Sequence, residues 1–502
     1  MSERERAHMS DEELEKMLQS ELPELPPPDE IVSDVTPWRR ASDRVFAGLA
    51  LTMLTLNFLG LNYILPAIGM VLMLLGLRTL RRENGWFKAC FVLTVVRAVQ
   101  FFAVCILNTT LYMQVINDGG AGAALTWLSA AMGLASAVCL WQALSAVRRK
   151  AGLEGGATAG GAVVAWYVFV LILAAVKYEG IIIAAAMIIS YILIIRGLVK
   201  LSRELEQTGY AIEPSPTRVS DKTLVIAVAL ALIIGVICGY TFGTSYNMDW
   251  QSVSEASQEQ TEIKSHLLEL GFPQDVLDDL SSEDIAKLES AEQVVSEPPE
   301  DISTRGDNGP AVTHVAVRLS GGERERWIVI HHFCWDGSRS FNGTECIQLW
   351  PTYRDVPEGW SSVSVSDDGS RRDSAFGRVL YTKDGTDYEA PFWYLGAESY
   401  MRDTIFWGKE QTNDIFAAFS GPRHAERLRG YVAYETLCSD PSYIFSSWMN
   451  YFHQQTLLQY PVMSAMECCK NGSAWTSGGA FSLTQYALQF YRYDDGSIEL
   501  IS

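Results

Sequence analysis

His331, His332 and Cys334 lie close together in one apolar segment and are residue types that could support catalysis or bind a metal. A Cys–His pair can provide a nucleophile, and the same side chains can ligate zinc. Alternation along a β-strand puts His332 and Cys334 on one face and His331 on the other. Neither chemistry has a matching second half at a recognisable spacing. We therefore predict no catalytic residues, no metal site and no cofactor.

Arg97 is a second candidate, because it lies in the middle of the apolar segment FVLTVVRAVQFFAV, residues 91–104. Counted from Trp86 it is about 11 residues into a helix, or roughly 16 Å, which is close to the centre of a bilayer. An unaccompanied arginine there costs at least about 2.5–3.5 kcal/mol, so Arg97 should face the interior of a helical bundle. It is either a structural residue bonded to carbonyls and amides or a site for an anionic solute or lipid.

Partners for Arg97 are expected to be neutral, apart from Glu179 at the outer edge, since none of the predicted spans contains an aspartate or glutamate. Gln100 lies one turn along on the same face of the helix. Other polar candidates are Asn57, Thr94, Gln142, Ser190 and Tyr191. The missing carboxylates weigh against a proton- or sodium-coupled transporter, whose relays usually need acids within the membrane.

Tryptophans supply a third set of candidates, because nine of the fourteen lie after residue 244. Some must fill a core, whereas a surplus on a sheet face or a loop would give flat platforms for sugar rings or peptide side chains. Trp335, Trp393 and Trp407 are the binding candidates, with Asp336 as a hydrogen-bond acceptor.

Long apolar stretches between residues 44 and 244 indicate a bundle of membrane-spanning helices, which contains Arg97. About seven spans are predicted, at 44–59, 61–78, 86–108, 121–147, 158–178, 180–199 and 223–243. Gly60, Asn62 and Pro66 interrupt the first stretch, so residues 44–80 are expected to form a hairpin of two short helices, although a single span is the alternative.

A small residue at every fourth position marks one face of the last predicted span, at Gly235, Gly239 and Gly243. Small residues let helix backbones approach closely, on which packing within a membrane depends. This face packs either within the bundle or across a dimer.

The distribution of charge predicts direction and excludes one class of partner. Residues 1–37, 38–244 and 245–502 carry net charges of −8, +8 and −20. Because cytoplasmic loops retain lysine and arginine, and seven spans put every basic cluster on one side, the N-terminus is predicted inside and residues 245–502 outside the plasma membrane. Neither polar region has a basic patch, so we predict no nucleic-acid binding.

The polar regions divide into three parts. Residues 1–43 are predicted as an acidic, proline-rich cytoplasmic tail with a short amphipathic helix at 10–22, which is either a solvated segment or a docking segment for a cytoplasmic partner. Residues 245–310 are predicted as a helical spacer and linker. From residue 311 to 502, short β-branched and aromatic segments separated by turns such as Asp384-Gly385 predict an antiparallel β-sandwich or jelly roll.

Together these features predict a non-enzymatic, multi-pass membrane protein of a cell envelope whose outer β domain binds a ligand or partner, as a sensor or receptor does. The bilayer is one partner, and a glycan, a peptide or another envelope protein is the other. A transporter or channel for an anionic solute or lipid, centred on Arg97, is the alternative. An envelope enzyme that uses outer acids or Cys334 is a third hypothesis.

Overall fold

The computed structural model divides the chain into two compact units. The helical unit comprises residues up to Cys105 and Gly120–Leu232, and the β unit comprises Ile106–Gly119 and Ile233–Ser502. The structure describes residues 36–501 except for 54–59, 177, 179, 214, 254–257, 300–308, 322–323, 337–342, 355–358, 363–374, 405–407, 424, 439, 441, 457–458, 473–478 and 494. The predicted amphipathic helix at 10–22 and most of the linker before residue 311 lie outside these residues.

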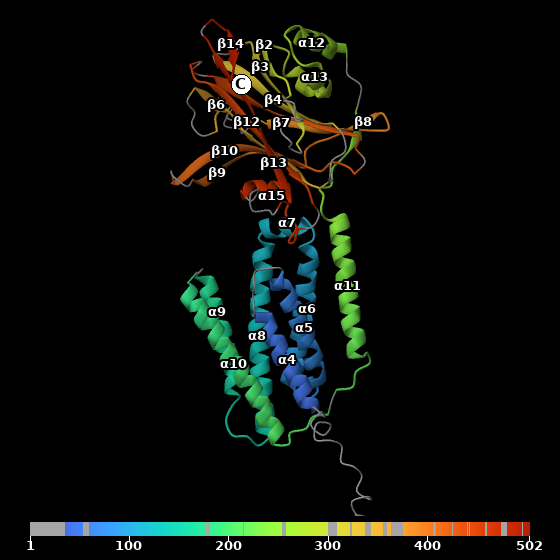
Figure 1. Ribbon diagram of the computed structural model, residues 1–502, viewed down its shortest axis with the longest axis vertical. Helices are drawn as coiled ribbons and strands as arrows, with labels where there is room; N and C mark the ends of the chain where they lie inside the picture. The colour runs from blue at the N-terminus through green and yellow to red at the C-terminus, as the bar shows by residue number, and fades with distance from the viewer. Residues whose placement is uncertain are drawn as a thin grey trace, which may run out of the picture. The chain divides into compact units, whose positions relative to one another are not determined.

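Long helices make up the helical unit (Figure 1). They are α4 (Pro37–Met53), α5 (Leu61–Leu80), α6 (Gly85–Leu107), α8 (Ala121–Lys150), α9 (Thr158–Ala175), α10 (Ile181–Gln207) and α11 (Asp221–Phe242), and two of them, α6 and α11, continue along the chain into the β unit. Within the described residues, all of these except α4 are long and apolar enough to cross a membrane, which gives six candidate spans. The count of seven depends on α4 and residues 54–59, and it stays a prediction.

The first two helices form the expected hairpin. A Cβ atom added at Gly48 would lie 2.5 Å from the carbonyl oxygen of Gly69, and one at Gly76 would lie 2.6 Å from that of Ala41. Contacts that pair an early residue of α4 with a late residue of α5 require the two helices to run antiparallel. Glycine is therefore needed at these positions so that the two backbones can touch.

Two helices extend well beyond the predicted spans, whereas the others differ from them by three residues or fewer at the described ends. The first begins at Pro37 rather than at residue 44, because proline suits the first turn of a helix. The sixth predicted span ended at residue 199, but α10 continues to Gln207. Its extension buries Leu201 and Leu205 in the same apolar cluster as Trp38, so packing outside the apolar stretch prolongs the helix.

The β unit contains two antiparallel sheets (Figure 1). One has the order β1-β8-β7-β11-β4-β3-β2 with β6 paired to β11, and the other has the order β14-β13-β12-β5-β10-β9. The strands are β1 (Gln251–Ser252), β2 (Ala291–Glu297), β3 (Ala311–Leu319), β4 (Glu325–Asp336), β5 (Glu345–Trp350), β6 (Trp360–Ser362), β7 (Ala375–Lys383), β8 (Thr386–Ala390), β9 (Tyr394–Thr404), β10 (Gly408–Phe419), β11 (Arg427–Cys438), β12 (Phe445–Gln454), β13 (Phe481–Arg492) and β14 (Ile498–Leu500).

Side chains of both sheets share one apolar core. Trp327 and Phe333 of β4 meet Phe419 of β10 and Phe445 of β12 there. The antiparallel strands confirm the coarse prediction for this region, whereas a sandwich or jelly-roll shape stays a prediction. The Asp384-Gly385 turn joins β7 to β8, with φ angles of 51° and 75° that suit the tight hairpin expected of this dipeptide.

Short helices cover the other face of the larger sheet. They are α12 (Gln258–Glu269), α13 (Gln274–Asp279) and α14 (Ser282–Ala286). The other two short helices of the β unit, α7 (Tyr112–Asp118) and α15 (Ala465–Lys470), lie elsewhere. Leu267 and Val276 pack on Val315 and Ile330 of the sheet. Residues 245–310 were predicted as a spacer, but these buried contacts and the strands β1 and β2 place them in the β unit.

Candidate functional site

Arg97 lies on α6, and its guanidinium donates a hydrogen bond of 3.5 Å to the Tyr167 hydroxyl of α9. The Nε atom of Arg97 is buried and has no hydrogen-bond partner among the described residues. The same holds for Thr94 Oγ1 and Gln100 Oε1, on the same side of the helix. The Gln100 amide donates to the carbonyl of Leu125 on α8, at 3.2 Å. The arginine and its two polar neighbours one turn away along α6 therefore each have one buried polar atom with unused bonding capacity.

Tyr167 reaches Arg97 because it passes over a glycine. A Cβ atom added at Gly133 of α8 would lie 3.0 Å from the Tyr167 ring and hydroxyl, so a larger residue would displace the ring. Tyr167 was not among the partners expected for Arg97. Its separation of 70 residues from Arg97 leaves no local pattern that could have identified it.

His331 and His332 lie on opposite faces of β4, as alternation predicts. His331 contacts the Nδ1 atom of His314 at 2.6 Å and Ser447 Oγ at 2.9 Å. All three residues are buried, and burial lowers the pKa of His314 to about 4 and holds the pKa of His331 well below its usual value. A substrate cannot reach this serine and histidine without unfolding the core, so we assign them a structural role.

His332 and Cys334 are also held by neighbours. His332 Nε2 lies 2.8 Å from a carboxylate oxygen of Asp279, and Arg429 donates to the other oxygen at 2.8 Å. The sulfur of Cys334 accepts a hydrogen bond of 3.3 Å from Arg427. Within the described part of the chain, no three histidine, cysteine, aspartate or glutamate side chains gather in a way that could hold a metal ion.

The candidate tryptophans do not form one group. Trp335 is half-buried, and its indole N–H donates to the Tyr451 hydroxyl at 3.0 Å. Asp336 pairs through its backbone with Arg427, and its side chain lies outside the described part of the structure, as does Trp407. Trp393 is 47% exposed and stacks on Tyr246, with ring centroids 4.2 Å apart and an interplanar angle of 14°.

The stacked pair Trp393 and Tyr246 lines a cavity of about 800 Å³ within the β unit. We call it the aromatic cavity. Its wall comes from four parts of the chain: the end of α11 with residues 243–247, the short helix α7 with Leu111 before it, the start of β9, and α15. Its other lining residues are Leu111, Tyr112, Gln114, Val115, Asn117, Phe242, Gly243, Ser245, Asn247, Tyr394, Ser464, Met466, Glu467, Lys470 and Asn471. Of this set, the sequence singled out Trp393 as a binding residue and Gly243 as a helix-packing residue.

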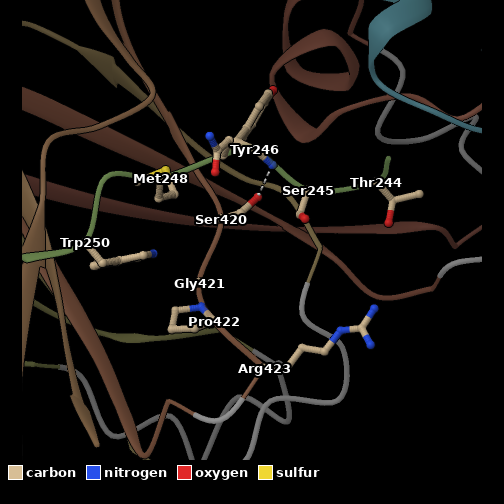
Figure 2. Close-up of a pocket in the computed structure, with 10 residues that line it drawn as sticks. Thr244, Ser245, Tyr246, Met248, Trp250, Ser420, Gly421, Pro422 and Arg423 are labelled. Atoms are coloured by element: carbon tan, nitrogen blue, oxygen red, sulfur yellow. Dashed lines mark hydrogen bonds between the residues drawn. The ribbon is translucent and has the colours of Figure 1, made fainter. Parts of the chain in front are cut away.

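A smaller cavity of about 230 Å³ shares Ser245, Tyr246 and Asn247 with the aromatic cavity, and Figure 2 shows its lining. The Tyr246 backbone N–H donates to Ser420 Oγ at 3.0 Å, drawn as the dashed line. Met248 and Trp250 follow along the same segment and also line this cavity. The bond to Ser420 fixes the segment that places the Tyr246 ring against Trp393.

The glycine face of α11 lies against residues of the same chain. A Cβ atom added at Gly235 would lie 2.5 Å from Ile106, and Cβ atoms added at Gly239 and Gly243 would collide with Thr109 and Thr110. The backbone N–H of Leu111 donates to the Gly243 carbonyl at 2.8 Å. These contacts show that the three glycines pack against residues 106–111 of the same chain.

Comparisons with known proteins add little to this geometry. No protein family matches the chain, and no curated protein matches it. Among solved structures, a "Pore forming protein" aligns with a TM-score of 0.20 and 5% identity over 42% of this chain and 94% of that chain. The Clostridium perfringens delta-toxin aligns with a TM-score of 0.18 and 7% identity over 42% of this chain and 92% of that chain.

Proposed function

We propose that this chain is a receptor-like, multi-pass membrane protein that binds a ligand in the aromatic cavity. The single observation that supports this most is the stacked pair Trp393 and Tyr246 at the wall of a cavity of about 800 Å³. Binding sites of small ligands have this size, with aromatic walls and a few polar groups that orient the ligand. Trp393 is 47% exposed beside this cavity, so its ring is available to a ligand.

The proposal includes a route by which binding could be sensed. Tyr246 lies three residues after Gly243, whose carbonyl accepts the Leu111 N–H. One turn earlier on α11, the Tyr240 hydroxyl donates to the Gln459 carbonyl at 2.8 Å. A ligand that moves the Tyr246 segment would therefore pull on the last turn of an apolar helix.

The proposal keeps the predicted sidedness. The β unit lies outside the plasma membrane, where it meets a glycan, a peptide or an envelope protein, and residues 1–43 lie in the cytoplasm, where they can dock a partner. The basic clusters that flank the apolar helices support this direction.

Replacing Trp393 with alanine should weaken ligand binding at least tenfold, because the change removes the largest aromatic surface of the cavity wall. We would screen the full-length protein in lipid nanodiscs against saccharides, short peptides and fatty acids. Binding would be measured as the ligand-induced rise in unfolding temperature. Any positive probe would then be applied to intact and to permeabilised cells.

Tyr491→Ala is the matched control for this screen, since Tyr491 is 48% exposed in the β unit and does not line the aromatic cavity. Binding that survives in Tyr491→Ala and is lost in Trp393→Ala supports the receptor proposal. A screen without any Trp393-dependent ligand would reject it. Binding that requires permeabilised cells would place the β unit in the cytoplasm.

The polar group around Arg97 favours a second candidate function, a transporter or channel for an anionic solute or lipid. The supporting observation is that Arg97 Nε is buried without a hydrogen-bond partner among the described residues. Arginine attracts anions and presents several donors in a fixed fork. The Tyr167 hydroxyl at 3.5 Å is a long contact that an anion could replace.

Arg97→Leu should reduce anion flux in proteoliposomes at least tenfold, because it removes the positive charge that would attract the anion. The probes are chloride, inorganic phosphate and a fluorescent phosphatidylserine. Arg97→Lys keeps the charge and should retain part of the flux. Arg196→Leu, which removes an exposed arginine of α10, serves as the control. Equal flux in wild type and Arg97→Leu would exclude this function.

A further inference from the structure

We propose that the aromatic cavity recognises a neutral carbohydrate, an inference that rests on the proposed function and names its ligand class. The aromatic wall, the polar side chains opposite it and the charge of the lining all bear on the choice. Each of them separates a sugar from the other molecules that a cavity of about 800 Å³ could hold.

The aromatic wall suits the flat, C–H-bearing face of a pyranose ring. Tyr246 stacks on one face of the Trp393 indole and holds that ring in place, and the indole is 47% exposed, so its other face is available to a sugar. The electron-rich face of an aromatic ring attracts the slightly positive C–H groups of a sugar, and no deep apolar slot is required. Tyr112, 64% exposed on α7, adds a phenol whose hydroxyl can both donate and accept.

The polar part of the lining is dominated by carboxamides. Gln114, Asn117, Asn247 and Asn471 each present a donor and an acceptor group, as sugar hydroxyls do. The Nε2 atom of Gln114 is buried and has no hydrogen-bond partner among the described residues. A buried donor left unsatisfied costs free energy, so Gln114 gains from a ligand that brings an acceptor.

The charges of the lining disfavour an anion. Glu467 and Lys470 are its charged side chains, and Lys470 is already paired with Glu398 at 2.5 Å. The local balance is therefore negative, and residues 245–502 carry a net charge of −20. Sialylated sugars, phosphorylated ligands and fatty-acid carboxylates would all be repelled.

Neutral sugar could come from a free glycan or from the head group of a glycolipid. Phe242, 79% exposed at the end of α11, and Val115, 58% exposed on α7, both lie at the lining of the cavity. These apolar side chains could contact the first carbons of the acyl chains of a glycolipid whose sugar is bound in the cavity. The two sources share the recognition chemistry and differ only in whether an acyl chain adds to affinity.

The test uses full-length protein in phosphatidylcholine nanodiscs and three kinds of probe: multivalent neutral oligosaccharides, their sialylated counterparts, and vesicles that contain a neutral glucosyl-diacylglycerol. We expect binding of neutral probes and none of sialylated ones. Trp393→Ala should weaken binding at least tenfold and Gln114→Leu about tenfold, while Tyr491→Ala leaves it unchanged. Trp393→Phe keeps an aromatic face and should restore most of the binding.

The outcomes distinguish the source of the sugar, the class of ligand and the location of the site. Stronger binding to the glycolipid vesicles than to soluble oligosaccharides identifies a membrane source, and equal binding identifies free glycan. Trp393-dependent binding of peptides or fatty acids alone overturns the carbohydrate assignment and leaves the receptor proposal in place. Sugar binding that ignores both Trp393→Ala and Gln114→Leu overturns the assignment to this cavity. No binding of any probe overturns both proposals.

Discussion

Replacement of Asp279 by alanine is expected to lower the free energy of unfolding of the β unit by about 3–5 kcal/mol. Asp279 accepts from His332 and from Arg429, and the Arg429 side chain is only 4% exposed. Without Asp279, the guanidinium is left buried with Asp387 as its remaining carboxylate, which is itself half-exposed. The measurement is thermal unfolding of the full-length protein in nanodiscs, followed by tryptophan fluorescence, with a shift on the order of 10 °C.

The neighbouring aspartate supplies the control for this prediction. Asp278 has a side chain that is 57% exposed, and it lies 3.8 Å from Lys264. Exposed ion pairs of this kind contribute about 0–1 kcal/mol, so Asp278→Ala should leave the unfolding temperature almost unchanged. Equal losses in the two variants would show that the cost comes from the helix α13 and not from the buried charge network.

Acidification from pH 6.5 to 4 is expected to remove about 3 kcal/mol of stability from the β unit through His314 alone. Burial lowers the pKa of His314 to about 4, whereas the unfolded chain takes up the proton near the usual value of 6.5. Protons therefore bind more strongly to the unfolded state over this range. The stabilisation is complete above pH 6.5 and is lost as the pH falls toward 4.

His331 adds to this effect in the same direction, since burial also lowers its pKa and it faces His314, Ser447 and Tyr434. Unfolding in urea at a series of pH values gives the free energy directly. His314→Gln should reduce the slope between pH 6.5 and 4. Stability that stays constant over this interval in the wild type would contradict the buried, neutral histidine pair.

Local sequence signals were sufficient to predict most of the long apolar helices. Six apolar helices appear where runs of apolar residues predicted them, and Gly60 precedes α5 as a break in the first run. The small residues of α11 contact Ile106, Thr109 and Thr110, which fits the packing role that their spacing suggested. Such features depend on neighbours within a few turns, so periodicity and residue size carry them.

Contacts between distant segments could not be predicted in this way. Asp279 meets His332 over 53 residues and Arg429 over 150, and nothing in the sequence around Asp279 indicates either partner. The aromatic cavity has the same character, because Tyr246 reaches Trp393 only after α11, α7 and the sheets have been assembled. The surplus of tryptophans after residue 244 was enough to make Trp393 a binding candidate, but nothing in the sequence indicated Tyr246 as the residue that stacks on it.

The contact between α4 and α5 also bears on how often this region crosses a bilayer. Gly48 and Gly69 bring the two backbones into direct contact, so the two helices form one antiparallel pair. On its own, α5 is long and apolar enough to cross a membrane, and the predicted count of seven requires α4 to cross with it. The predicted sidedness therefore depends on the glycines that let these two helices touch.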